Sequence, residues 1–469
     1  MAIRPTSLFC TVMASFALAP CSQSILAEST ASTASTETTQ HISTPPTQYE
    51  KGPLPLDDLR AFTEVLQRIK SSYVEPIDDK SLLENAIRGM LDNLDPHSAY
   101  LKKEDYKDLE ESTSGEFGGL GIEVSGEDGL IKVITPIDGT PAHSAGIKAG
   151  DLIIELNDTP IRGLGLKKSV ELMRGPAGEP ITLTIIREDA PGPLEITVVR
   201  EIIKVNSVRH LMLEKGLGYI RISQFQVDTG KEVQSALNEM RNKDKLNGVI
   251  LDLRNNPGGV LQAAVEVSDL FLKNGLIVYT KGRITNSNYN YNATKNDPSL
   301  GVPLVVMING GSASASEIVA GALQDHRRGI VVGTKSFGKG SVQTVLPLST
   351  DSERGLKLTT ALYYTPNGRS IQAEGIVPDI TVDNISITLV KESGGYREAN
   401  LQNHLDNSAG EATSKNDNKG ADNDLDNSPA VTDYQLHQAL NILKSLHLYN
   451  QQFGIGQNMA TPPDTIKPQ

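Results

Sequence analysis

Two stretches of this sequence carry residues that can act as a nucleophile and a base. Residues 309–318, NGGSASASEI, follow an apolar run and contain three serines. Residues 335–343, KSFGKGSVQ, contain two lysines, the second of which lies between two glycines. A serine attacks a carbonyl group only when a base takes its proton and donors stabilise the oxyanion that forms. The two stretches therefore indicate acyl-transfer chemistry, and the pattern alone leaves the choice of serine and base open.

Histidine is the usual base, and the sequence offers eight of them. Only His326 is close to the serines along the chain, and it is expected at the far end of the helix that the serines precede. At 1.5 Å per residue it would lie about 18 Å from them. No pair of histidines has the spacing of a zinc protease. We therefore expect His326 to be structural, and we expect no metal or cofactor.

Lysine can serve as the base if it is neutral. At pH 7 only about one free lysine in 2,500 is unprotonated, but burial penalises the charged form and lowers the pKa. Lys339 lies between Gly338 and Gly340, in a turn that can enclose its amine, whereas Lys335 has polar neighbours and is expected to be exposed. Taken alone, these residues favour an ordinary surface lysine at position 339.

The N-terminus has the pattern of a secretory signal peptide. Arg4 is followed by an apolar run over residues 8–18 and then by small residues, with a plausible cleavage site after Ala27. The alternative is a lipid-modified N-terminus at Cys21. Both cysteines lie in the first 21 residues, so a chain cut after Ala27 has neither a disulfide nor a thiol nucleophile. We expect export, most simply to the periplasm, with lipid anchoring through Cys21 as the alternative.

Composition and periodicity predict an α+β protein of several parts. The net charge of −13 argues against a broad nucleic-acid surface. Beyond the signal peptide, no apolar run reaches the roughly 20 residues of a membrane-spanning helix. In chain order the predicted parts are a signal peptide (1–27), a disordered linker (28–55), a helical N-terminal region (56–111), a β-rich domain (112–200), an α/β core (201–390) and a low-complexity tail with one short helix (391–469).

The β-rich domain begins with a glycine-rich segment, GGLGI, at residues 118–122. Such a segment can form a nest of backbone N–H groups that binds a carboxylate, but these five residues alone favour a simple hairpin turn. Together with SAGIKAGDLI at 144–153 and the turn at 157–158, it resembles a PDZ domain. The resemblance implies capture of a polypeptide C-terminus by Gly119, Leu120, Gly121 and Ile122.

Four further motifs are similar to those of the carboxyl-terminal processing peptidases. They are LRNNPGG at 253–259, GSASASEI at 311–318, FGKG at 337–340 and TPNGRSI at 365–371. With the PDZ-like segment, the resemblance covers about residues 55–385. It implies a helical N-terminal cap, a PDZ domain and a crotonase-like α/β serine protease core. The implied activity is that of an exported serine endopeptidase that cleaves polypeptides near their C-termini.

Carried onto this sequence, the resemblance implies a Ser/Lys dyad of Ser314 and Lys339. Gln343 matches the glutamine that supports the lysine. Asp325 matches an acidic residue grouped with the pair, and we expect it to be structural because a carboxylate near the lysine would raise the lysine's pKa. The implied oxyanion donors are the backbone N–H groups of Ala315 and of Gly258 or Gly259.

Other residues of these motifs have simpler interpretations beside the functional one. Ser312 and Ser316 suit helix caps, and Glu317 suits the first turn of a helix, where a negative charge is favoured. Arg174, at the end of the PDZ-like helix, suits a cation at a helix C-terminus. The sharper hypothesis makes Arg174 a regulatory contact that couples peptide capture to the protease core.

Two other classes of function compete with this one. A non-catalytic PDZ peptide-binding or scaffold protein would have no use for Ser314, Lys339 and Gln343 together. A lipid or acyl-group hydrolase on a crotonase-like fold would have no use for the PDZ-like segment. The expected partners are polypeptides with exposed C-termini, while an adaptor protein and a homo-oligomer stay open. We expect no nucleic-acid partner, and membrane contact only through an N-terminal lipid.

Overall fold

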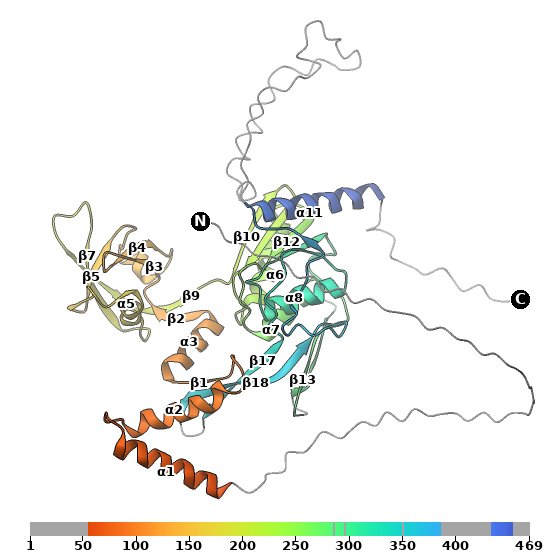
Figure 1. The fold of residues 1–469 in the computed structure, drawn as a ribbon. Coiled ribbons are helices and arrows are strands. Elements are labelled where there is room, and N and C mark those ends of the chain that lie inside the picture. Colours follow the sequence, from red (N-terminus) through yellow and green to blue (C-terminus); the bar gives the residue numbers. More distant parts are fainter. Residues whose placement is uncertain (1–54, 285–286, 295–296, 349–350, 386–432, 454–469) are drawn as a thin grey trace, which may run out of the picture. The chain divides into compact units, whose positions relative to one another are not determined.

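A computed structural model describes five ranges of the chain, residues 55–284, 287–294, 297–348, 351–385 and 433–453 (Figure 1). The expected signal peptide (1–27), nearly all of the expected linker (28–55) and most of the expected tail (391–469) lie outside the described residues. Among the helices that are described, none is long and apolar enough to span a membrane.

The core is built on a six-stranded sheet. Its order is β10 (Val208–Glu214), β11 (Leu217–Ile222), β12 (Gly248–Asp252), β15 (Leu304–Ile308), β16 (Ile330–Gly333) and β19 (Ile380–Thr381). From β11 to β19 the neighbouring strands are parallel, and β10 pairs antiparallel with β11. β12 and β15 are buried along their whole lengths. Burial on both faces is the reason that these strands are nearly continuous apolar runs in the sequence.

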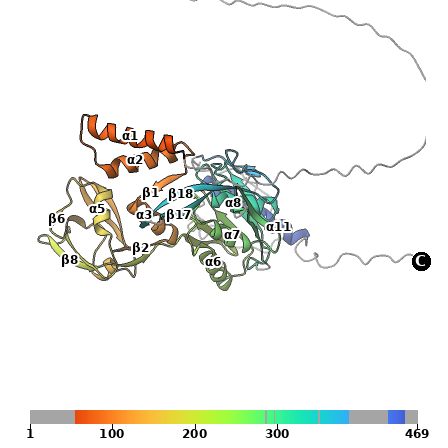
Figure 2. The same ribbon diagram turned by 90° about the horizontal axis from the view of Figure 1, so that it is seen from below.

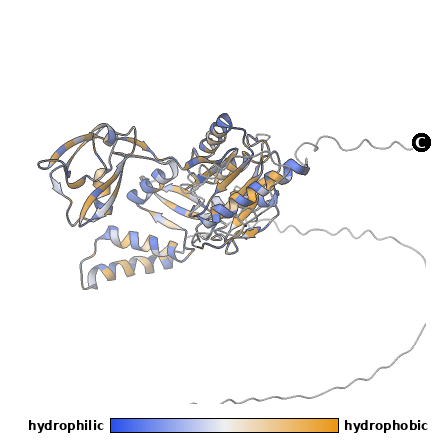
Figure 3. Ribbon diagram, turned by 90° about the horizontal axis from the view of Figure 1, so that it is seen from above, coloured by the Kyte–Doolittle hydropathy of each residue, from blue (hydrophilic) through white to orange (hydrophobic). Residues whose placement is uncertain are grey.

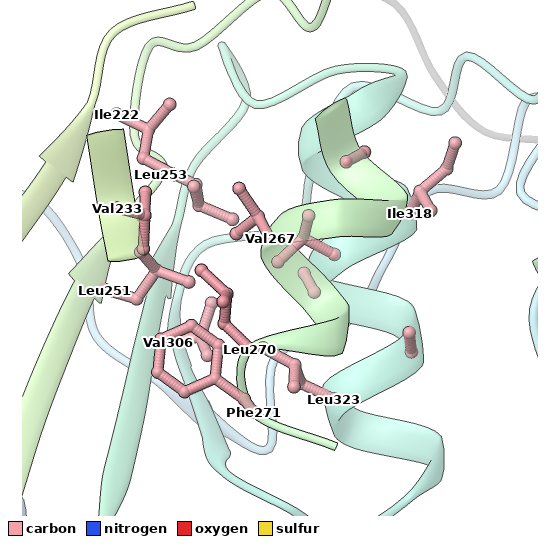
Figure 4. Close-up of a cluster of buried hydrophobic side chains, with 14 of the residues drawn as sticks. Ile222, Val233, Leu251, Leu253, Val267, Leu270, Phe271, Val306, Ile318 and Leu323 are labelled. Carbon is pink, nitrogen blue, oxygen red and sulfur yellow. The ribbon is translucent and has the colours of Figure 1, made fainter. Parts of the chain in front are cut away.

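Three helices cover one face of this sheet: α6 (Thr229–Lys243), α7 (Leu261–Asp269) and α8 (Ala315–Asp325). Strand residues such as Leu251 and Val306 point to this side and pack against Val267 and Phe271, all of them almost fully buried (Figure 4). The apolar, alanine-rich α8 is buried on most of its surface. The serine-containing turn that precedes α8 is therefore attached to a helix buried in the core.

Helix α11 (Tyr434–Phe453) covers the opposite face of the sheet (Figure 1). Its Leu440 and Leu443 pack against Ile250 and Val305, which alternate with the strand residues that face α7 and α8. The helix was expected to be short and to belong to a low-complexity tail. It has 20 residues and forms a layer of the core.

A second sheet extends from the core toward the N-terminal region. Its strands are β1 (Ala99–Leu101), β18 (Asp351–Tyr364), β13 (Leu276–Gly282) and β14 (Asn290–Asn292), and β17 (Ser341–Leu348) pairs with β18. β17 begins two residues after Lys339. β1 comes from the predicted N-terminal cap, so this sheet joins two segments that are distant in the sequence.

The N-terminal region contains α1 (Leu56–Ser72), α2 (Asp79–Asp92) and α3 (Lys103–Ser114). The Asp78 side chain caps α2 by accepting a hydrogen bond from the Ser81 N–H group at 3.0 Å. α1 has no buried residue, and its apolar side chains, including Phe62 and Val65, are exposed at helical spacing. In Figure 3 the helices of this region carry both hydrophobic and hydrophilic residues.

The PDZ-like segment folds around its own hydrophobic core, which includes Val133, Ile153 and Leu183. Its helices are α4 (Pro141–Ser144) and α5 (Leu166–Met173). Its strands run in the order β3 (Ile122–Glu127), β4 (Leu130–Pro136), β5 (Leu152–Leu156), β7 (Pro180–Ile186) and β8 (Leu194–Val199), with β6 (Thr159–Pro160) paired to β5. Its α5, β6 and β8 are labelled in Figure 2. A ribbon of β2 (Glu116–Gly119) and β9 (Glu201–Lys204) joins the segment to the rest of the chain. β3 lies at the edge of its sheet.

The packing of α11 predicts a measurable loss of stability. Leu443→Ala should lower the free energy of unfolding of the core by about 2–4 kcal/mol, because Leu443 is fully buried against the sheet. Leu448→Ala, at an exposed position of the same helix, should change it by about 0.5 kcal/mol or less. Urea unfolding followed by circular dichroism measures both. Equal effects of the two substitutions would contradict a packed α11.

Candidate active site

Ser314 occupies the sharp turn between β15 and α8. Its backbone angles are φ 54° and ψ −110°. A positive φ is uncommon outside glycine, and such conformations gather at functional sites, where the surrounding structure holds them in place. A serine on a strained strand-to-helix turn has the geometry of a nucleophile elbow.

The three serines of this turn have different environments in the structure. The Ser312 hydroxyl donates to the Leu253 carbonyl at 2.8 Å, and the Ser316 hydroxyl donates to the Asn256 carbonyl at 2.9 Å. Both side chains are fully buried, whereas Ser314 is partly exposed. Ser312 and Ser316 thus fasten the turn to the loop after β12, and neither caps α8 as the sequence suggested. Ser314 is the serine whose side chain can meet a substrate.

The two lysines of the next turn also differ. Lys335 is exposed, as expected, and Lys339 is half-buried. Burial lowers the pKa of Lys339, and the positive charge of Lys357 lowers it further. The carboxylates of Asp95 and Glu317 act in the opposite direction, but the net shift is downward. The structure therefore gives Lys339 the direction of pKa shift that a neutral base requires.

A buried carboxylate, that of Glu317, connects the serine turn with the lysine turn. Its Oε2 accepts hydrogen bonds from the backbone N–H groups of Ser314 at 2.8 Å and of Lys339 at 2.9 Å. Its Oε1 accepts from the Ser336 hydroxyl at 2.6 Å and from the Gly338 N–H group at 2.7 Å. Burial raises the pKa of Glu317, and these four donors oppose that shift. One oxygen atom thus holds the backbones of Ser314 and Lys339 together.

Tyr363, on β18, fixes the lysine turn from the other side. Its hydroxyl donates to the Lys339 carbonyl and lies beside the Ser314 side chain. The ring is almost fully buried, and burial together with the charge of Glu317 raises the pKa of Tyr363. The phenol therefore stays protonated near neutral pH and acts as a hydrogen-bond donor.

The loop after β12 lies directly against the serine turn. A side chain at Gly258 would approach the Ser314 Cβ atom to 2.8 Å and the Ala315 nitrogen to 3.0 Å, so only glycine fits there. The Gly258 N–H group already donates to Asn256 Oδ1 at 2.9 Å. The N–H groups of Gly259 and Ala315 make no hydrogen bond with any described residue. Of the expected oxyanion donors, these two are free.

Gln343 and Asp325 make their hydrogen bonds with residues other than Lys339. The Gln343 amide nitrogen donates to Ser341 Oγ at 2.9 Å and to Thr359 Oγ1 at 3.3 Å. Asp325 lies at the far end of α8, where it pairs with Arg369 and accepts from the Asn367 N–H group at 2.9 Å. Asp325 thus anchors the turn at 365–371, in keeping with a structural role.

The expected peptide-binding segment lies between β2 and β3. Gly121 has a φ of 77°, and a side chain there would collide with Thr140. The carbonyl groups of Leu120 and Gly121 accept from the N–H groups of Ala142 and Ile137 at 2.9 Å. Within the described part of the chain, the N–H groups of Leu120 and Gly121 have no acceptor. Two neighbouring free N–H groups beside an edge strand suit the binding of a carboxylate.

Arg174 follows α5 and reaches helix α3. Its guanidinium donates to Glu111 at 2.7 Å and lies over the Phe117 ring, 4.9 Å from the ring centroid. The end of α3 is in turn bonded to the core, because the Val227 N–H group donates to the Thr113 carbonyl at 3.0 Å. Arg174 therefore contacts a helix whose end is bonded to the segment after β11, and Phe225 of that segment pairs with Gly259.

Among the described residues, no group of three or more histidine, cysteine or acidic side chains is arranged to hold a metal ion.

Comparison with known proteins identifies the family. Residues 216–382 match the family model described as "Peptidase family S41", residues 109–186 match "PDZ domain", and residues 13–105 match "Activating protease CtpB N-terminal domain". A "Carboxy-terminal-processing protease" of Bartonella bacilliformis is 51% identical over 354 residues, which cover 74% of this chain and 80% of that protein.

The chain belongs to peptidase family S41.

Other relatives agree with this assignment. The "Carboxy-terminal processing protease CtpA" of Bacillus subtilis is 35% identical over 323 residues, 69% of this chain and 68% of that protein. Among solved structures, a photosystem II D1 C-terminal processing protease is 31% identical and covers 69% of this chain and 92% of its own, with a TM-score of 0.41. The family assignment rests on the sequence relatives. This S41 peptidase is therefore a serine peptidase of the carboxyl-terminal processing group.

Several residues of the site were not predicted from the sequence. Glu317 was expected only as a helix-dipole partner, and Tyr363 was not singled out. Asp95 and His97, from a break in the helical pattern before β1, come within electrostatic reach of Lys339. The clue in the sequence was that break itself, DPHS at 95–98. It shows that the helical pattern ends there, but it does not show that the turn lies near Lys339.

The role of Glu317 can be tested by Glu317→Gln. This change keeps the size of the side chain but turns an NH₂ group toward backbone donors. We expect the free energy of unfolding to fall by about 1–3 kcal/mol and peptide cleavage to slow by about 100-fold, because the serine and lysine turns separate. Urea unfolding and a peptide-cleavage assay measure the two effects. Glu374→Gln, at an exposed position of the core, is the control. Normal stability and activity in Glu317→Gln would refute the role of this carboxylate.

Proposed function

We propose that this S41 peptidase is an exported endopeptidase that captures polypeptide C-termini in its PDZ domain and cleaves the chain with a Ser314–Lys339 dyad. The observation that carries the proposal is the shared bonding of the Ser314 and Lys339 backbones to one oxygen of Glu317. It is supported by the partly exposed side chain of Ser314 on its strained turn and by the lowered pKa of Lys339.

The proposed reaction proceeds through an acyl-enzyme. Neutral Lys339 takes the Ser314 hydroxyl proton as the serine oxygen attacks the peptide carbonyl carbon. The free N–H groups of Ala315 and Gly259 stabilise the oxyanion. The C–N bond then breaks, and protonated Lys339 gives its proton to the leaving amine. Neutral Lys339 next activates a water molecule, which hydrolyses the ester and regenerates Ser314.

Substrate capture is proposed for the edge of the PDZ sheet. A polypeptide C-terminus would add as a strand beside β3, whose outer side has no neighbouring strand among the described residues. Its terminal carboxylate would accept hydrogen bonds from the N–H groups of Leu120 and Gly121. Gly119 and Ile122 end the two strands that flank this turn and hold it in place.

Location and assembly are also proposals. Export rests on the signal-like N-terminus, with the periplasm as destination and a lipid at Cys21 as the alternative. The substrates are polypeptides with accessible C-termini, and an adaptor protein is compatible with the same capture. The exposed apolar stripe of α1, which includes Phe62 and Val65, supports a contact between copies of the chain.

The dyad predicts the effect of two substitutions. Ser314→Ala and Lys339→Ala should each reduce cleavage of a peptide substrate to background, because the nucleophile or its base is lost. His326→Ala should retain most activity, since its ring is bonded to the Leu276 carbonyl, away from the dyad. The wild-type rate should rise with pH through the lowered pKa of Lys339, because the amine accepts a proton only when neutral. Full activity in Lys339→Ala, or inhibition by a chelator that zinc reverses, would contradict the Ser314–Lys339 mechanism.

Coupling through Arg174 predicts a separation of binding from cleavage. Arg174→Ala and Glu111→Gln should leave the affinity for a C-terminal peptide unchanged and lower the cleavage rate by similar factors, of about tenfold. Fluorescence anisotropy of a labelled peptide and its rate of cleavage measure the two quantities. Arg162→Ala, at an exposed position of the PDZ domain, serves as the charge-matched control. Unchanged turnover in Arg174→Ala would remove the coupling role.

A further inference from the structure

The turn before β1 is organised by the side chain of Asp95. Asp95 Oδ1 accepts hydrogen bonds from the N–H groups of His97 at 2.8 Å and Ser98 at 3.0 Å, and Oδ2 accepts from the Ser98 hydroxyl at 2.6 Å. Burial opposes ionisation of Asp95, but these bonds outweigh it and lower the pKa of the carboxyl group. The turn therefore presents a charged, fully bonded carboxylate.

This turn is joined to the protease core through Thr359 of β18. The Thr359 hydroxyl donates to Asp95 Oδ1 at 3.1 Å, and the Thr359 N–H group donates to the Ser98 hydroxyl at 3.1 Å. The next residues form β1, which pairs with β18 with Ala99 opposite Lys357. The N-terminal region thus makes specific polar contacts with the strand that carries Tyr363.

Thr359 transmits this contact to Gln343. The two residues face each other across β17 and β18, and the Gln343 amide nitrogen donates to Thr359 Oγ1 at 3.3 Å. A hydroxyl has a single proton, and the ionised Asp95 takes it. Thr359 can then only accept from Gln343. This fixes the amide with its nitrogen toward Thr359 and leaves Gln343 Oε1, which accepts from no residue in the described ranges, as a free acceptor.

The same turn belongs to the electrostatic environment of Lys339. The charged groups that act on Lys339 are Lys357, which lowers its pKa, and Asp95 and Glu317, which raise it. His97 also faces Lys339. Burial, and then the charge of Lys339, lower the pKa of His97, so the imidazole is neutral near pH 7.

We propose that Asp95 is a positioning residue of the peptidase, which orients the Gln343 amide through the Thr359 hydroxyl and makes the Ser314–Lys339 site depend on docking of the N-terminal turn. This inference rests on the proposed function. It assigns a catalytic purpose to a segment outside the matched peptidase region, 216–382. The N-terminal region is then part of the active enzyme and not only a cap.

The first test uses the full chain and removes the Thr359 hydroxyl, which links Asp95 to Gln343. Thr359→Val removes the hydroxyl at nearly constant shape and should lower kcat for peptide cleavage by roughly 10- to 100-fold with little change in KM. Thr359→Ser keeps the hydroxyl and should restore most of kcat. Peptide affinity of the PDZ domain and circular dichroism confirm folding of each variant. Equal kcat in all three proteins, or equal losses in Thr359→Val and Thr359→Ser, would overturn the inference.

A second variant tests the charge of Asp95 through the pH profile. Asp95→Asn removes a negative charge that raises the pKa of Lys339. The acid limb of the kcat/KM profile should therefore move to lower pH, by roughly 0.5 unit, a shift that a purely structural role would not produce. Asp92→Asn, an exposed acid on α2, makes the same change of charge away from the turn and should leave the profile in place.

The outcomes separate this inference from the proposed function. Background activity in Ser314→Ala, together with a wild-type profile and rate in Asp95→Asn, would overturn the inference alone. Cleavage that persists in Ser314→Ala would overturn the proposed function. If Thr359→Val does not fold, the Asp95→Asn profile decides: a shift to lower pH supports the inference, and no shift overturns it.

Discussion

The carboxylate of Glu317 is the constraint on which the arrangement of this site depends. It is fully buried and accepts four hydrogen bonds, from backbone and hydroxyl groups of two separate turns. A buried carboxylate must be hydrogen-bonded to avoid a large desolvation cost. If the two turns separated, the Glu317 carboxylate would lose hydrogen-bond donors or become exposed to water. The positions of Ser314 and Lys339 are thereby fixed by one group that takes no direct part in the proposed chemistry.

Other layers of the structure keep these two turns from moving. α8, which follows Ser314, is buried in the main hydrophobic cluster, and α11 closes the other face of the sheet. The second sheet holds Tyr363 against the Lys339 carbonyl and brings Asp95 to the same side. Rigid support of this kind is what a serine in a strained conformation and a partly desolvated lysine require.

Sequence patterns predicted the local features of the fold, whereas the choice of Ser314 and Lys339 needed the resemblance to the carboxyl-terminal processing peptidases. The sequence predicted an α/β core over residues 201–390, and in that core β12 and β15 are apolar strands that lie buried side by side in a parallel pair. The contrast between Lys335 and Lys339 followed from their neighbours. The rest depends on tertiary contacts. Glu317 looked like any acid in a first helical turn, because its four donors come from residues that only folding brings near.

The same limit applies to the segments that are distant in sequence. The Asp95 turn contacts Thr359 from the other end of the chain, and α11 returns to the core after a long polar stretch. Local periodicity predicts the secondary structure of each segment, but it does not predict which distant segment it packs against. The most direct test of the account is the rate at which a fluorophosphonate labels the protein, measured against pH, with the labelled residue identified by mass spectrometry. We expect labelling at Ser314 that rises with pH and is about 100-fold slower in Lys339→Ala. Labelling of another residue, or equal rates in the two proteins, would contradict it.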